Sequence, residues 1–100
     1  MRPDNHAKLR HQALEDPALG LGAKGLLCLV SQLLEADPDT AVMAEVQERT
    51  KDSDYRIAQR MKELVEAGYI TRRRGNAPNG KLRWVYDLHS PKRASKRNVA

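Results

Sequence analysis

The sequence contains no phenylalanine and only four aromatic residues, so aliphatic side chains must supply most of its hydrophobic core. Its single cysteine, Cys28, excludes an internal disulfide. No apolar stretch approaches the roughly 20 residues that cross a bilayer. The N-terminus, MRPDNHAKLR, also lacks the apolar segment of a secretory signal. We therefore expect a cytoplasmic protein.

Residue patterns typical of enzymes and metal sites are also missing. The histidines at 6, 11 and 89 are isolated and form no HExxH motif, and Cys28 has no CxxC partner. The run GLGAKG at residues 20–25 lacks the spacing of a phosphate-binding loop, and no predicted strand precedes it. We predict no enzymatic activity, no metal and no cofactor.

Charge is distributed unevenly along the chain. Residues 1–50 carry 5 Lys/Arg and 8 Asp/Glu, a net charge of −3, whereas residues 51–100 carry 13 and 5, a net charge of +8. A solubilising surface does not require such asymmetry, so the second half is predicted to meet a polyanion.

The chain of 100 residues is long enough for one hydrophobic core, and its elements are predicted from periodicity and turn signals. Leu26, Leu27, Val30, Leu33 and Leu34 form one helical stripe, and this helix is apolar over more than half its circumference. Its second side is expected to be covered by the N-terminal arm or by a second copy, which predicts a possible homodimer. We expect a flexible arm (1–8), one domain (9–89) and a basic disordered tail (90–100). Within the domain the predicted elements are a short helix or turn within 9–19, helices over 21–36, 40–50 and 54–67, and strands over 69–74 and 81–88.

Several residues mark the limits of these elements. Thr40 and Ser53 are predicted helix N-caps, and Gly68 stands where a left-handed residue ends a helix. Asn79-Gly80 is a strong hairpin signal because both residues tolerate positive φ. The fold class is therefore mainly α with a small β-hairpin (α+β), a three-helix winged helix-turn-helix.

The run VQERTKDSDYRIAQRMKELVEAGYITRRR resembles the core of winged helix-turn-helix proteins in bacterial regulators and in replication-initiator modules of plasmids and phages. The resemblance covers roughly residues 12–88. It implies binding to double-stranded DNA, as a transcription regulator or as a replication or mobile-element accessory factor that is nucleoid-associated when bound. The motif is specific for the fold and weak for the biological role.

The helix over 54–67 is predicted to read bases in the major groove. Tyr55, Arg56 and Gln59 point away from its buried stripe, whereas Arg60 lies at the edge and is equally suited to pairing with a carboxylate. Lys51 and Ser53 are placed to reach phosphates from the preceding turn. The alternative is that these side chains form an ordinary solvent-exposed helix face without a role in DNA binding.

The hairpin is predicted to contact the phosphate backbone or the minor groove of the DNA. Its basic residues are expected to approach one another across the strands, which would destabilise it without an anionic partner. They are Arg72, Arg73, Arg74, Lys81 and Arg83. Trp84, Tyr86 and Tyr69 are predicted core residues, with stacking on single-stranded bases as the lesser alternative for Trp84 and Tyr86.

Two other functions compete with duplex binding. A protein-interaction module would use the acidic first half and the helix surface around Cys28 and Leu29. Binding of RNA or single strands through the basic hairpin and tail ranks last. For Lys92, Arg93, Lys96 and Arg97, phosphate contacts and a solvated terminus are equally compatible with the sequence.

Overall fold

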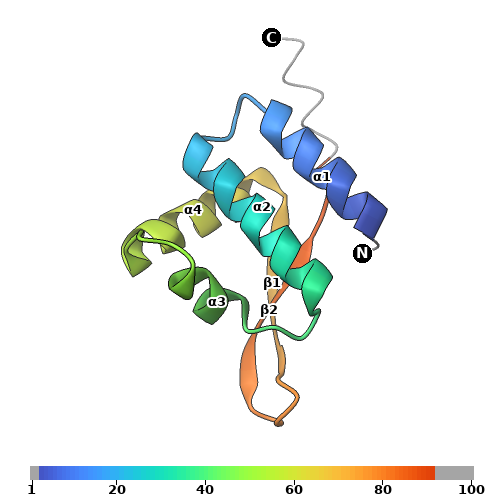
Figure 1. Cartoon of the computed structure of the whole chain (residues 1–100), viewed down its shortest axis with the longest axis vertical. Coiled ribbons are helices and arrows are strands. Elements are labelled where there is room, and N and C mark those ends of the chain that lie inside the picture. Colours follow the sequence, from blue (N-terminus) through green and yellow to red (C-terminus); the bar gives the residue numbers. More distant parts are fainter. Residues whose placement is uncertain (1–2, 92–100) are drawn as a thin grey trace.

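The computed structural model describes residues 3–91, with side chains from His6 onward, as four helices followed by a two-stranded hairpin (Figure 1). The predicted class, mainly α with a small β-hairpin, is confirmed, although the described residues form four helices where three were expected. The predicted tail lies almost entirely outside the described residues. The elements are α1 (Pro3–Glu15), α2 (Leu21–Ala36), α3 (Val42–Glu48), α4 (Asp54–Ala67), β1 (Ile70–Asn76) and β2 (Leu82–Leu88).

The first helix is where the fold departs most from the sequence prediction. Residues 3–8 were expected in a flexible arm, but they form the first turns of α1. The buried side of this helix consists of His6, Leu9 and Ala13, which follow the i, i+3, i+7 spacing of one helical face. One aliphatic residue per turn is too weak a hydrophobic period to reveal a helix in the sequence.

α1 packs on α2 and covers its second apolar side. The His6 Nδ1 atom lies 3.2 Å from the carbonyl oxygen of Ser31. Arg10 donates to the Ser31 hydroxyl at 3.0 Å and to the carboxylate of Glu35 at 3.1 Å. The covering segment is thus the N-terminal one, the first of the two alternatives that the sequence left open.

The two strongly periodic helices have the predicted limits. α2 buries four of the five residues of its predicted stripe, Leu26, Leu27, Val30 and Leu33, whereas Leu34 is only partly buried. α4 buries Ile57, Met61 and Leu64 against the same core. Hydrophobic periodicity over four turns was sufficient to define both helices.

The helix ends follow local chemistry, with one correction. Ser53 caps α4 by accepting a hydrogen bond from the Arg56 N–H at 3.2 Å, and Gly68 ends it with φ 91°. Thr40 does not cap α3, which begins at Val42 after an N-cap without a side-chain hydrogen bond. The Thr40 N–H instead donates to the carbonyl of Asp37, closing a turn.

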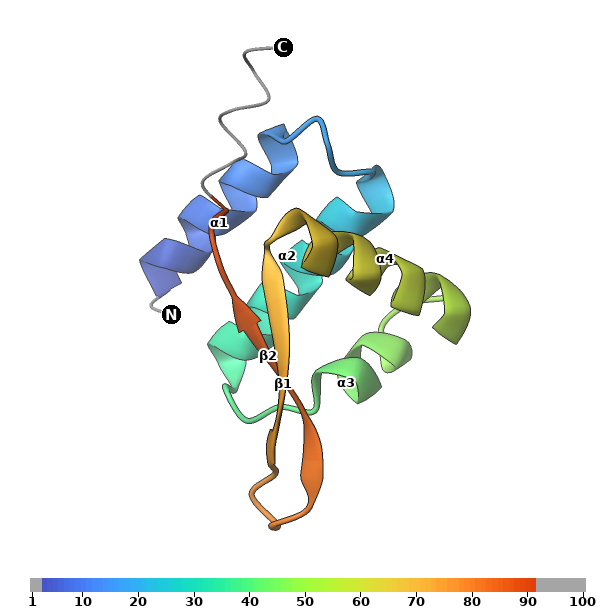
Figure 2. The ribbon, with the colours of Figure 1, turned by 180° about the vertical axis from the view of Figure 1, so that it is seen from behind.

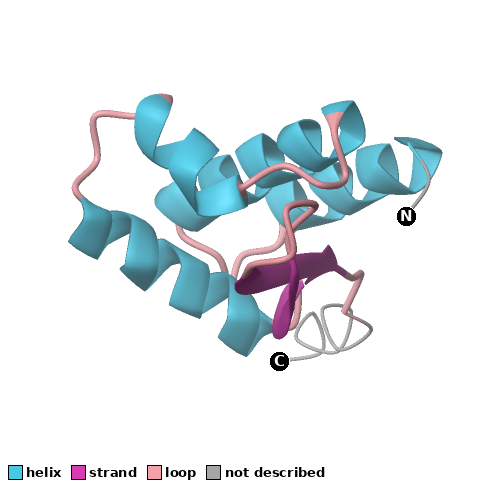
Figure 3. Ribbon diagram, turned by 90° about the horizontal axis from the view of Figure 1, so that it is seen from below, coloured by secondary structure: helices cyan, strands magenta, loops and turns pink. Residues whose placement is uncertain are grey.

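The hairpin begins in the core and ends beyond it. At its base, Ile70, Tyr86 and Leu88 are buried, and the fully buried Tyr69 donates its hydroxyl to Asp16 at 2.7 Å. Figure 2 shows both strands running past the helices to a free tip, and Figure 3 shows the helices gathered to one side of the strands. The outer half of the hairpin is therefore available to solvent.

The hairpin tip is a three-residue turn formed by Pro78, Asn79 and Gly80, in the stretch where the Asn79-Gly80 signal predicted the hairpin connection. The Gly80 N–H donates to the carbonyl of Ala77, and the Ala77 N–H donates to the carbonyl of Lys81. Among the described residues only Gly68 and Gly80 have positive φ, so Asn79 does not adopt the expected conformation. A turn of this length followed by a left-handed glycine is a common hairpin connection.

Candidate nucleic-acid interface

The first half of α4 presents the predicted base-reading side chains to solvent. Tyr55 is 70 % exposed, and Gln59 donates its amide N–H to the Tyr55 hydroxyl at 2.9 Å. Arg56 is exposed on the same part of the helix, as are Lys51 and Ser53 in the preceding turn. Because the Ser53 cap fixes the helix start, these five predicted residues lie together around one rigid helix end.

Arg60, by contrast, belongs to the contact between α4 and α2. Its side chain lies against Gly22, where an added Cβ would meet the Arg60 Nε at 2.6 Å. Its guanidinium is also 4.0 Å from the carboxylate of Glu63, which accepts from the Gly20 N–H at 2.8 Å. Arg60 therefore takes the carboxylate-pairing alternative, whereas the contact of Glu63 with Gly20 joins residues too far apart in the sequence to be predicted.

The strand register corrects the expected clash of basic residues. Arg72 lies opposite Tyr86, Arg73 opposite Val85, and Arg74 opposite Trp84. Each arginine therefore faces an apolar or aromatic residue, and no two basic residues are paired directly across the two described strands. Contrary to the prediction, the hairpin is not destabilised by like charges directly opposite one another.

One face of the hairpin holds its arginines in intramolecular contacts. The Arg73 Nε donates to the carboxylate of Asp87 at 2.9 Å. Arg83 donates to the backbone carbonyl of Asp39 at 2.7 Å, which ties β2 to the connection between α2 and α3. Both arginines therefore have structural partners, although both were predicted as DNA contacts.

The opposite face carries Arg72, Arg74 and Trp84. The guanidinium carbons of Arg72 and Arg74 lie 5.5 Å and 5.1 Å from the centroid of the Trp84 ring, within cation–π range. Trp84 is 48 % exposed, so its assignment to the core is wrong: the strand carries it beyond the helices. Lys81 is exposed beside the turn.

Tyr86 is a core residue, as predicted, at the inner end of this face. Burial raises the pKa of its hydroxyl above the ordinary value of 10.0, and Arg72 beside it lowers the pKa and offsets part of that rise. The phenol is therefore neutral near pH 7. Arg72 accordingly remains a net positive charge on this face.

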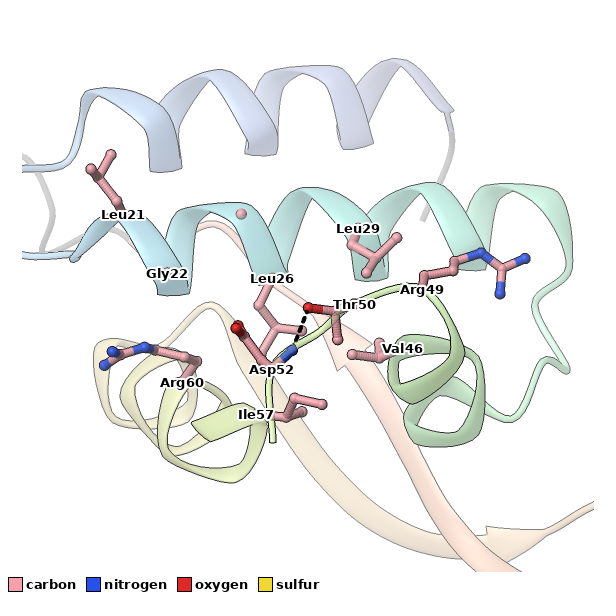
Figure 4. A pocket seen from close by; sticks show the side chains of 11 residues that line it. Leu21, Gly22, Leu26, Leu29, Val46, Arg49, Thr50, Asp52, Ile57 and Arg60 are labelled. Atoms are coloured by element: carbon pink, nitrogen blue, oxygen red, sulfur yellow. Dashed lines mark hydrogen bonds between the residues drawn. The ribbon is translucent and has the colours of Figure 1, made fainter. Parts of the chain in front are cut away.

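A separate groove lies between α2, α3 and α4 (Figure 4). It has a volume of about 280 Å³, with Leu26, Leu29, Val46 and Ile57 among its apolar lining residues. Arg49 and Arg60 also line it, and Figure 4 shows them toward opposite ends. This groove includes Leu29, one of the residues predicted for a protein-interaction surface.

The described residues contain no group of three His, Cys, Asp or Glu side chains that could hold a metal ion. No helix in the same range combines the length and apolarity of a membrane span. The exposed end of α4 and the outer hairpin thus remain the main candidate for a functional surface. Comparison of the chain with protein-family models, curated proteins and solved structures found no match.

Proposed function

We propose that the chain is a winged helix-turn-helix protein that binds double-stranded DNA with sequence specificity. In this proposal α3 and α4 form the helix-turn-helix, and the β1–β2 hairpin is the wing. The first half of α4 enters the major groove, while the wing contacts the backbone or the minor groove. The biological role is that of a transcription regulator or a replication or mobile-element accessory factor.

The observation that carries this proposal is the set of arginines left without a carboxylate. Within residues 6–91, Arg56 and Arg74 have no ion pair, whereas ion pairs are present for Arg10, Arg49, Arg60 and Arg73. Arg56 stands at the exposed start of α4, and Arg74 stands on the outer hairpin. Guanidinium groups without a carboxylate partner can pair bidentately with guanine and can neutralise phosphates.

The first test is binding to a random-sequence duplex by fluorescence anisotropy over a series of salt concentrations. Duplex binding through phosphates predicts a linear fall of log K with log salt concentration, with a slope of about −0.9 for each phosphate neutralised. No binding even at about 50 mM salt, where non-specific electrostatic binding is strong, would refute the proposal.

The two hairpin faces predict different effects of removing one arginine. Arg74→Ala should weaken binding to all duplex sequences and lower the salt slope by about one, because it removes an unpaired cation. Arg73→Ala should change the slope less, because Arg73 is already partly neutralised by Asp87. Equal slopes for wild type and Arg74→Ala, with a reduced slope for Arg73→Ala, would contradict this assignment.

We further propose that two or more copies bind cooperatively to repeated half-sites, because one small module contacts few base pairs. The helix side that suggested a preformed dimer is covered by α1. Analytical ultracentrifugation should therefore find a monomer without DNA and two protomers on a selected site. A stable dimer in the absence of DNA would contradict this form of assembly.

A second candidate function is protein interaction through the groove between α2, α3 and α4. The observation in its favour is Leu21, which lines the groove and is 88 % exposed. Absence of duplex binding at low salt, together with capture of a protein partner that Leu21→Ser abolishes, would favour this function over the first.

A further inference from the structure

The outer hairpin exposes apolar side chains that the core does not use. Leu82 is 67 % exposed and Trp84 is 48 % exposed, and both are on β2 with one residue between them. Side chains at this spacing point to the same side of a strand. Their cross-strand partners, Asn76 and Arg74, share that side.

Two cations lie beside this apolar surface. Arg72 and Arg74 both place their guanidinium carbons within 5.5 Å of the Trp84 ring centroid. The arginines of the other face, Arg73 and Arg83, are held by Asp87 and by the Asp39 carbonyl. The arginines of one hairpin face are thus held by oxygen atoms of the protein. Those of the other face contact an aromatic ring, and they can leave it to bind an anionic ligand.

We propose that this surface, made of Arg72, Arg74, Leu82 and Trp84, binds an unpaired base of DNA adjacent to the duplex held by α4. The Trp84 ring stacks on the base, and the two arginines move to the flanking phosphates. The proposal rests on the proposed function for its duplex part, and it narrows the substrate to DNA that contains both paired and unpaired segments.

The chemistry of the surface favours an unpaired base over a paired one. Within a duplex the faces of each base are covered by its neighbours, and only the base edges are open in the grooves. An indole ring requires an open base face, which unpaired nucleotides provide. Aromatic rings interleaved with basic side chains are the common means of binding single strands, and stacking tolerates any base.

The sequence offers a direct probe because Trp84 is its only tryptophan. Tryptophan fluorescence and DNA affinity are measured for a blunt duplex, for the same duplex with a short single-stranded extension, and for the single strand alone. We expect stacking to quench the fluorescence with the extended duplex much more than with the blunt one. We also expect the extended duplex to bind about 5- to 100-fold more tightly.

Variants separate stacking from charge. Trp84→Ala should bring the ratio of the two affinities close to one, whereas Trp84→Phe should retain part of the preference. The inference is overturned if wild type binds both duplexes equally well. It is also overturned if the fluorescence does not change, or if Trp84→Ala retains the full preference.

The same data distinguish this inference from the proposed function. Arg56→Ala should weaken binding to both duplexes and leave their affinity ratio unchanged. If the blunt duplex is not bound, while the single strand quenches Trp84 and binds with an affinity that Trp84→Ala lowers, duplex recognition fails and the stacking surface stands. If the blunt duplex is bound without any preference for the extension, stacking fails and the proposed function stands.

Discussion

Replacing Tyr69 with alanine should lower the free energy of unfolding by about 3–5 kcal/mol, the range found when a large buried aromatic is truncated. Tyr69 is the largest fully buried side chain of the described core. It follows the end of α4 and precedes β1, and its hydroxyl donates to Asp16 in the connection between α1 and α2. One substitution therefore weakens the contact that joins the helices to the hairpin.

Urea denaturation followed by far-UV circular dichroism measures this effect, and two variants serve as controls. Tyr69→Phe removes the hydrogen bond to Asp16 and keeps the ring, so about 1–2 kcal/mol is expected. Trp84→Ala removes a larger ring from a half-exposed site together with its two cation–π contacts, so about 1–2 kcal/mol is expected, less than for Tyr69→Ala. A loss below about 1 kcal/mol for Tyr69→Ala would contradict the described packing.

Arg56→Ala should reduce affinity for a selected cognate duplex by about 5- to 100-fold and relax the base preference at one position of the site. The reason is geometric: Arg56 lies in the first turn of a capped helix, and its side chain is exposed. A bidentate contact to guanine gives about 1–3 kcal/mol of discrimination against other bases. The measurement is the affinity for the selected site and for each single-base variant of it.

Lys8→Ala is the charge-matched control for this experiment. Lys8 is exposed on α1, so its removal changes the net charge equally without altering α4. We expect a small, sequence-independent loss of affinity for this variant. If Arg56→Ala behaves like Lys8→Ala at every base position, α4 is not the reading helix.

Hydrophobic periodicity in the sequence predicted two of the helices well and one poorly. α2 and α4 were predicted at their observed limits because each has a continuous apolar stripe and a clear terminal signal, such as Gly68. Only a short helix or turn within 9–19 was predicted for the region of α1, because the buried face of α1 includes a histidine and an alanine at positions where a strong period needs large aliphatic residues. Its helical character becomes evident only when the partner surface on α2 is present.

The hairpin shows where sequence reasoning ends. A two-residue turn at Asn79-Gly80 would pair Arg74 with Val85, whereas the observed three-residue turn pairs Arg74 with Trp84. Because strand faces alternate, a shift of one residue changes which side chains share a face. The basic residues of the hairpin were identified from the sequence. Their division was not: Arg73 and Arg83 are bound to oxygen atoms on one face, and Arg72 and Arg74 lie beside Trp84 on the other.

The candidate helix surface was predicted more completely than the hairpin. Tyr55, Arg56 and Gln59 are exposed as a helical projection required, because the buried stripe of α4 determines the opposite side. Arg60 lies at the edge of that stripe, where projection cannot decide, and its orientation depends on the absence of a side chain at Gly22. Edge positions of a helix are therefore the ones that need tertiary information.

We propose that DNA contacts the first half of α4 and the outer hairpin. Amide chemical-shift mapping during titration with a selected duplex would locate this contact surface residue by residue. We expect the largest shifts in residues 51–60 and 72–83, with little change over the exposed side of α1. Shifts confined to α1, or to residues 21–29 on the α2 side of the groove, would contradict this assignment.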